Sequence, residues 1–214
     1  LIASSISCAT TIHVSPNCNI VDAIKSADTD IATGGCSAGS GEDLVVLEPG
    51  QTYILTQPVD ALGGAATGLP VIHSKLTILG NGATITRSAN AGTPPFRLLA
   101  IAARAGDVTL DSVTLSNGLL TGTAGGAAIY NAGKLILRHS TLAGNAAEEG
   151  AGGLYVSPYT NASLEVISST ISGNAGVGLW AQDASVSLAN TTIAFNKGLG
   201  LQTQLGRVVL NNTI

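Results

Sequence analysis

Five short stretches in the second half of the chain repeat one pattern. They are DSVTLSNG (111–118), RHSTLAGN (138–145), SSTISGN (168–174), NTTIAFN (190–196) and NNTI (211–214). Each contains a threonine that is followed directly by an aliphatic residue, and the first four stretches contain an asparagine near their end. Self-similarity of this kind is the signature of a repeat architecture, so each stretch is expected to occupy the same place in structural units of about 22 residues.

Two ladders of aliphatic residues run through the same region. One consists of Ile129, Leu154, Leu179 and Leu201, and the other of Leu135, Leu164, Val186 and Val208. Apolar residues recur every second position around these ladders, and glycine or asparagine separates the runs, which is typical of short β-strands joined by turns. One unit therefore holds three strands. Longer units carry inserts at 118–124, 146–151 and 157–162, and the binding surface of a solenoid often lies on such loops.

The size of the unit decides between repeat folds. A β-propeller blade needs about 40 residues and four strands. Three strands in about 22 residues instead fit one coil of a right-handed parallel β-helix, in which each strand lies about 4.8 Å above its equivalent. We therefore predict an all-β fold, a right-handed parallel β-helix of roughly seven or eight coils with an N-terminal helical cap.

Asparagines at the end of four repeats are expected to form a stacking ladder. These residues are Asn117, Asn145, Asn174 and Asn196. Asparagine tolerates left-handed turn geometry, and stacked amides can hydrogen-bond to one another along the axis of the solenoid.

The first part of the chain differs from the repeats. Residues 1–43 are predicted to form a cap and residues 44–214 the β-helix. Asn19 and Asp22 fit a capping box, and apolar residues follow at helical spacing within 20–27. A short helix here would plug the end of the tube, because an open coil exposes unpaired backbone. The chain starts at Leu1 without a methionine, so it is expected to be a processed product or a fragment. The sequence stops within a repeat, so the last coil is expected to be incomplete, and either the chain was cut there or something else covers that end.

Three cysteines lie close to the N-terminus, namely Cys8, Cys18 and Cys36. No CxxC motif and no suitably spaced histidine accompanies them, which argues against a zinc site. Of the three possible pairings we favour Cys18–Cys36, a loop closure that stabilises by about 3 kcal/mol in the chain-entropy model. Cys8 is then free or paired with another chain, and the pattern predicts an exported, extracellular protein.

Three sequons for N-glycosylation begin at Asn161, Asn190 and Asn211. They become acceptors in a eukaryotic secretory pathway. Sequons also arise by chance in a chain rich in asparagine and threonine, and the unmodified state is the expected one.

The N-terminal segments resemble a known group of bacterial surface proteins, those with a CSLREA domain ahead of β-helix repeats. The matching segments are CNIVDAIKSAD (18–28), EDLVVLEPG (42–50) and LTILGNGATITR (76–87). Val21 stands where the group usually has arginine, and Asp28 where it has asparagine. The later repeats are similar to those of polymorphic outer-membrane proteins. The resemblance implies export and a surface module, and it implies no activity, because fold does not fix function.

Composition excludes several classes of function. Charged residues make up only 10% of the chain and its net charge is −4, so no basic surface is available for nucleic acid or an anionic membrane. Hydrophobic residues make up 45%, which argues against disorder, yet no apolar run is long enough for a membrane span.

No arrangement of catalytic residues is evident, and no cofactor or metal is expected. Acids in the repeats are few, namely Asp107, Asp111, Glu148, Glu149, Glu165 and Asp183, and no two stack in register. The histidines, His13, His73 and His139, fall at unrelated positions of the repeat. Asn145 with Glu148 and Glu149 has the oxygen ligands of a Ca²⁺ site, but a solvated turn is the favoured interpretation.

One aromatic column is predicted on the outer surface. If Ile129, Leu154 and Leu179 point inward, the residues that follow them point outward on successive coils. These are Tyr130, Tyr155 and Trp180, with Gln202 next in line and Tyr159 in the adjacent insert. Stacked rings can hold a sugar or a partner protein, or they can simply stabilise the solenoid.

Together these observations predict a non-catalytic extracellular or cell-surface module with a structural or adhesive role. Its expected partners are surface glycans or proteins, or other copies of itself. Two alternatives remain open. One is a subunit that stacks end to end into a filament, and the other is a polysaccharide lyase or hydrolase.

Overall fold

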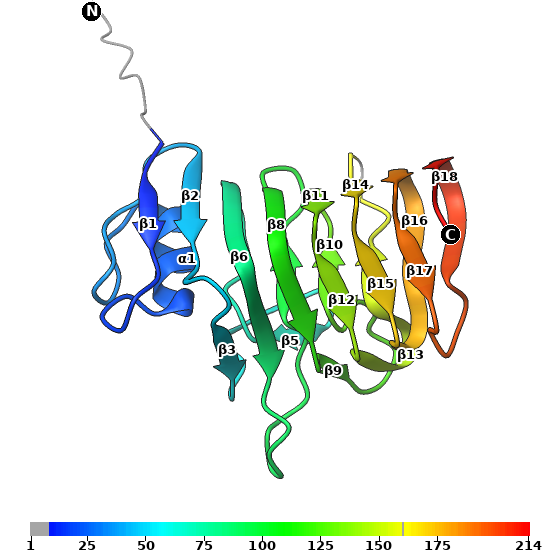
Figure 1. Ribbon diagram of the computed structural model, residues 1–214, viewed down its shortest axis with the longest axis horizontal. Helices are drawn as coiled ribbons and strands as arrows, with labels where there is room; N and C mark the ends of the chain where they lie inside the picture. Colours follow the sequence, from blue (N-terminus) through cyan, green and yellow to red (C-terminus); the bar gives the residue numbers. More distant parts are fainter. Residues whose placement is uncertain (1–8, 160) are drawn as a thin grey trace, which may run out of the picture.

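The computed structural model describes residues 9–159 and 161–214 and consists of stacked parallel coils with a cap at the N-terminal end (Figure 1). The elements are β1 (Thr11–His13), α1 (Ile20–Thr29), β2 (Asp43–Val46), β3 (Thr52–Leu55), β4 (Asp60–Leu62), β5 (Ala65–Thr67), β6 (Lys75–Arg87), β7 (Leu99–Ile101), β8 (Asp107–Ser116), β9 (Leu119–Leu120), β10 (Ile129–Asn131), β11 (Lys134–Arg138), β12 (Thr141–Ala143), β13 (Ala146–Val156), β14 (Ser163–Ile167), β15 (Thr170–Ser172), β16 (Ala175–Ala189), β17 (Thr192–Ala194) and β18 (Leu201–Asn211).

The coils present three faces, each a ladder of parallel strands. The first face runs through β1, β2, β6, β8, β11, β14, β16 and β18, the second through β3, β6, β8, β12, β15 and β17, and the third through β7, β10, β13, β16 and β18. Several long strands belong to two faces because they continue around a corner. The parallel β-helix predicted from the repeat length is confirmed.

Both predicted aliphatic ladders are in register. Ile129 lies beside Leu154, and Leu154 beside Leu179, and all three side chains are fully buried. Leu135 and Leu164 pair in the same way on the first face. The core is thus a stack of equivalent aliphatic residues, which close-pack because each coil repeats the shape of the one below.

The last repeat departs from its expected register. Thr213 was aligned with Thr192, but the Ile214 amide donates to the Thr191 carbonyl at 3.0 Å and the Ile193 amide donates to Ile214. Thr213 therefore lies opposite Thr191. The reason is that β18 pairs with β16 at a constant separation of 22 residues as far as Asn211 and Ala189, whereas Thr213 follows Thr192 by only 21 residues.

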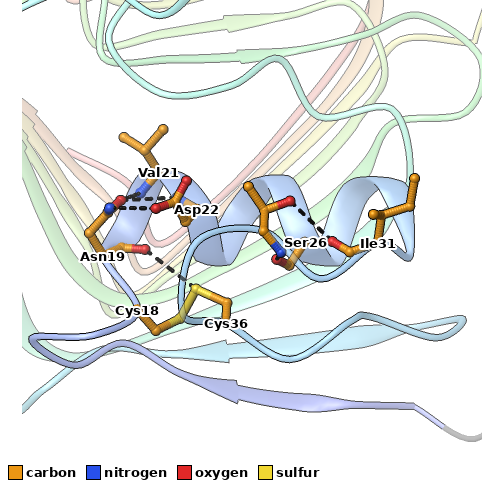
Figure 2. The surroundings of a disulfide bond; sticks show 8 residues. Cys18, Asn19, Val21, Asp22, Ser26, Ile31 and Cys36 are labelled. Atoms are coloured by element: carbon orange, nitrogen blue, oxygen red, sulfur yellow. Dashed lines mark hydrogen bonds between the residues drawn. A yellow bond between two sulfur atoms is a disulfide. The ribbon is translucent and has the colours of Figure 1, made fainter.

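The cap places α1 against β1, β2 and β6 at the end of the tube. The Asn19 side chain caps the helix as predicted, accepting from the Val21 and Asp22 amides at 3.0 Å each (Figure 2). A disulfide joins Cys18 to Cys36, with 4.7 Å between their Cα atoms, and this is the pairing favoured from the sequence. Cys8 lies outside the described residues.

The described part of the chain contains no helix of the length and apolar character needed to cross a membrane.

Candidate functional site

The aromatic column lies on the outer surface of the third face. Tyr130 of β10 pairs in register with Tyr155 of β13, and Tyr155 with Trp180 of β16. The ring centroids are 5.7 Å apart for the first pair and 5.3 Å for the second, and the rings are inclined at 46° and 61°. Such tilted and edge-on contacts are favourable for aromatic pairs. The column therefore exists as a continuous row, one ring per coil.

Glycines make room for each ring. A Cβ atom on Gly63 would lie 2.5 Å from Tyr130, one on Gly125 would lie 3.3 Å from Tyr155, and one on Gly150 would lie 3.3 Å from Trp180. All three glycines come from loops or inserts that precede the ring in the sequence. The rings therefore pack closely against backbone, which holds them in place.

A cleft of about 760 Å³ lies over the column. Besides the three rings, its lining includes Gly63 and Gly64 of one loop, Thr121 and Thr123 of the first insert, and Ser157 and Tyr159 of the third. Tyr159 is half exposed. None of the described residues that line the cleft is charged. The cleft thus offers aromatic surface and neutral hydroxyl groups.

Hydrogen bonds tie the column to a polar stripe beside it. The Tyr130 hydroxyl donates to Ser157 Oγ at 2.9 Å, and the Tyr155 hydroxyl donates to Gln182 Oε1. Gln182 Nε2 in turn donates to Gln204 Oε1 at 2.9 Å. Burial raises the pKa of Tyr155, and the neighbouring Tyr130 raises it further, so this hydroxyl stays protonated at neutral pH.

Arg97 lies against Tyr130, the first ring of the column, and was not recognised from the sequence. Its side chain is fully buried, and its guanidinium lies 4.6 Å from the centre of the Tyr130 ring. It donates to the carbonyls of Leu62 and Gly125, so it holds two walls of the cleft together. Burial lowers the pKa of Arg97 to about 10, and the group therefore remains charged at neutral pH. An arginine inside the apolar run FRLLAIA was the available signal.

Two unpaired polar atoms adjoin the cleft. Among the described residues, three buried side-chain atoms have no hydrogen-bond partner, and two of them are Arg97 Nε and Trp180 Nε1. The third is Ser74 Oγ. Buried polar atoms are normally paired, and each exception calls for an explanation. Their concentration here singles out this region of the molecule.

The asparagine ladder lies inside the coils and contains three of its four predicted members. Asn145 Nδ2 donates to Asn174 Oδ1 at 3.0 Å, and Asn174 Nδ2 donates to Asn196 Oδ1 at 2.9 Å. The same oxygens accept the backbone amides of Asn145 and Asn174. Asn145 and Asn174 are fully buried. The ladder is therefore a structural element with its amide groups occupied.

The prediction that Asn117 belongs to this ladder is wrong. Its side chain is exposed and donates to Thr86 Oγ1 at 3.0 Å. Gly118 occupies the ladder position, since its amide donates to Asn145 Oδ1 at 2.9 Å. Asn117 instead has a φ of 59° and occupies the left-handed corner that Gly144 and Gly173 occupy in later coils. The cause is its place in the repeat, one residue nearer to the threonine than the other asparagines.

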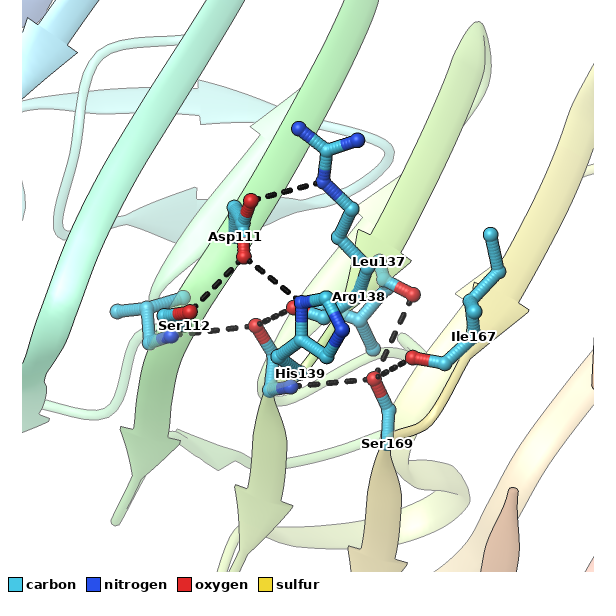
Figure 3. A network of polar contacts seen from close by, with 9 residues as sticks. Asp111, Ser112, Leu137, Arg138, His139, Ile167 and Ser169 are labelled. Carbon is cyan, nitrogen blue, oxygen red and sulfur yellow. Dashed lines mark hydrogen bonds and ion pairs between the residues drawn. The ribbon is translucent and has the colours of Figure 1, made fainter. Parts of the chain in front are cut away.

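A polar network at the corner between the first and second faces joins two coils (Figure 3). Asp111 Oδ2 accepts from Arg138 Nε at 2.8 Å, and Asp111 Oδ1 lies 3.2 Å from His139 Nδ1 and accepts from Ser112 Oγ at 2.9 Å. Burial alone would raise the pKa of Asp111, but the hydrogen bonds from Ser112 and His139 and the charge of Arg138 lower it overall. The network resembles a crosslink between coils, because each of its carboxylate oxygens is engaged.

The other acids and histidines are dispersed. Glu165 lies on the first face beside Ile136 and Ser187, whereas Glu148 lies at the second insert and accepts the Gly122 amide at 2.8 Å. The histidines lie on β1, beside Asp28 and beside Asp111.

No Ca²⁺ site forms from Asn145, Glu148 and Glu149, because Asn145 is buried in the ladder while both glutamates are exposed. Within the described ranges, no three His, Cys, Asp or Glu side chains gather as a metal site.

The three sequon asparagines are all exposed. Asn161 precedes β14 in the third insert, Asn190 follows β16 and Asn211 ends β18. Asn190 Oδ1 accepts from Asn212 Nδ2 at 2.8 Å. The expectation that these asparagines are unmodified stays a prediction.

Comparison with known proteins supports the fold over most of the chain. Residues 74–214 match the family model described as a right-handed beta helix region. Searches of curated proteins and of solved structures each gave no match. The matched residues contain every coil from β6 to β18, including the strands that carry the aromatic column. The chain therefore belongs to the right-handed β-helix family.

Proposed function

We propose that this protein is a non-catalytic, extracellular or cell-surface module with an adhesive role, and that its cleft binds a neutral saccharide. The observation that carries the proposal is the row of three rings on the floor of a cleft whose described lining is uncharged. Binding sites are typically concave, largely apolar and aromatic, with a few placed polar groups.

The chemistry of a sugar fits this lining. One face of a pyranose ring carries C–H groups that pack on an aromatic ring, while its hydroxyls need hydrogen-bond partners at the edges. Thr121, Thr123 and Ser157 supply hydroxyl groups at the walls. The spacing of one ring per coil suits an extended chain that runs along the solenoid.

Export is supported by separate features. A disulfide closes the cap between Cys18 and Cys36, and disulfides persist mainly in oxidising compartments. The likeness of residues 18–28 to a CSLREA domain favours the same location. Antibody labelling of intact source cells tests it, and labelling only after permeabilisation would contradict it.

The binding proposal can be tested through Trp180, the only tryptophan in the chain. Its emission reports on the cleft during titration with soluble glucan, mannan and galactan. We expect at least one of them to cause a saturable change. In calorimetry, Trp180→Ala should weaken that binding by roughly tenfold or more, because it removes one stacking surface.

Phe195→Ala is the matched control. Phe195 is 92% exposed and lies between β17 and β18, at the corner between the second and third faces and outside the cleft lining, so its loss should leave saccharide affinity unchanged. Equal weakening by both variants, or binding that survives Trp180→Ala intact, would refute the proposed site.

A second candidate function, end-to-end assembly, is favoured by one observation. Large apolar residues are exposed on and beside the last coil, namely Phe195, Leu199, Leu205, Val209, Leu210 and Ile214. A β-edge of a second copy that pairs with β18 would continue the parallel ladders of the solenoid. Light scattering over a range of concentrations tests this function, and a constant monomer mass would exclude it.

A further inference from the structure

The cleft is closed at the end that faces the cap. There the hairpin of β4 and β5 lies over the outer surface of the third face, and its Leu62 packs on a buried apolar cluster. The cluster includes Ala100 and Tyr130. Ala100 is the register partner of Tyr130, so the next position of the aromatic column lies beneath the hairpin.

Exposure along the column changes in one direction. Ala100 is fully buried and Tyr130 is 5% exposed. Tyr155 and Trp180 are half-buried, as is Gln202, the register partner of Trp180. The column therefore begins under a cover and opens toward the last coil.

The covering hairpin is firmly held. Gly63 and Gly64 form its two-residue turn with φ of 59° and 77°, the conformation that tight hairpins favour. Asp60 Oδ2 accepts the Val71 amide at 2.9 Å, and the buried Arg97 donates to the Leu62 carbonyl. Gly63 also rests directly on the Tyr130 ring. A ligand would not displace this hairpin without breaking these contacts.

We propose that the cleft recognises the end of a saccharide chain and not its interior. This inference rests on the proposed saccharide binding. The terminal sugar lies near Tyr130 against Gly63 and Gly64, and the chain leaves over Trp180 toward Gln202. An interior segment would have to continue through the volume that the hairpin occupies.

The first test compares each soluble neutral polysaccharide, glucan, mannan or galactan, with its own partial hydrolysate at equal mass of sugar. Chain ends increase on hydrolysis while the mass does not. We expect the hydrolysate to reach half-saturation of the Trp180 signal at a mass concentration at least fivefold lower. Equal half-saturation by mass, or tighter binding of the intact polymer, would overturn end recognition and leave saccharide binding intact. If no form of any polysaccharide binds, the proposed function fails as well.

The second test fills the closed end. Gly64 lines the cleft and a Cβ there meets nothing within 4 Å, and the same holds for Gly82 of β6, which is outside the cleft lining. Their φ values, 77° and 78°, are matched, and asparagine tolerates this conformation. Gly64→Asn should weaken binding of the hydrolysate by roughly tenfold, and Gly82→Asn should not change it. Both variants should unfold at the same urea concentration. Unchanged affinity in Gly64→Asn would overturn the proposal.

Discussion

The asparagine ladder and the aromatic column run along the same solenoid with one residue per coil, yet they have opposite characters. Asn145 and Asn174 are buried, and their amide groups are bonded to neighbouring coils. The aromatic column lies outside, and two buried donors beside it have no partner. A buried ladder with its amide bonds made contributes stability, whereas a row of partly exposed rings that lines a cleft presents its surface to a ligand.

The largest loss of stability is expected from a substitution in the buried asparagine ladder. Asn174→Ala removes the oxygen that accepts from Asn145 and the amide that donates to the Leu142 carbonyl. Each buried group left unpaired costs about 1–3 kcal/mol, so the free energy of unfolding should fall by roughly 3–5 kcal/mol in urea titration.

Asn117→Gly is the control for the ladder. It removes an exposed amide but suits the left-handed corner, where φ is 59°, and should change stability by less than about 1 kcal/mol. If both substitutions lowered the free energy of unfolding equally, the buried hydrogen bonds of Asn174 would not be the source of its contribution to stability.

A smaller loss of stability is expected from a substitution in the aromatic column on the outer surface. Trp180 is half-buried, and its removal leaves a site open to water. Trp180→Ala should therefore lower the free energy of unfolding by about 1–2 kcal/mol, less than a fully buried aromatic loses. Urea titration of Trp180→Ala and Asn174→Ala under the same conditions compares their free energies of unfolding. A loss as large as that of Asn174→Ala would mean that the column serves stability, and the comparison between the two ladders would fail.

The smallest effect concerns the corner network. The folded state lowers the pKa of Asp111 below its unfolded value, so its contribution is present above about pH 4 and is lost as the pH falls through the folded pKa. Asp111→Asn should cost at most about 1 kcal/mol at pH 6, and the difference from the wild type should shrink at pH 3. Asp183→Asn, at an exposed left-handed position, serves as the reference. A difference that grows toward pH 3 would reverse the assigned sign.

Stacking made much of the fold predictable, because each coil repeats the one below. Ile129, Leu154 and Leu179 could be aligned from spacing alone, since a buried position demands an aliphatic residue in every coil. The same reliance on sequence spacing misplaced Asn117 and Thr213, because each lies one residue away from the register of the coils. A shift of one residue is invisible in composition, yet it moves a side chain from the interior to a corner.

The cleft was only partly predictable. Alternation along the strands placed Tyr130, Tyr155 and Trp180 on one outer row. The roles of Arg97 and Gly63 depend on the position of the hairpin of β4 and β5. This hairpin is not part of the repeat, so the repeat pattern does not predict where it packs. Contacts made by insertions have no periodic signal, so they emerged only from the three-dimensional arrangement.

The identical bonding of Asn145 and Asn174 also bears on how such a protein can evolve. The side-chain amide of each asparagine donates to a backbone carbonyl of the preceding coil and to the asparagine of the following coil, so an in-frame duplication of one 22-residue repeat would insert a further rung with these donors and acceptors matched. The length of the rod is therefore free to drift between lineages, while the closed end under the hairpin, which exists once, stays fixed.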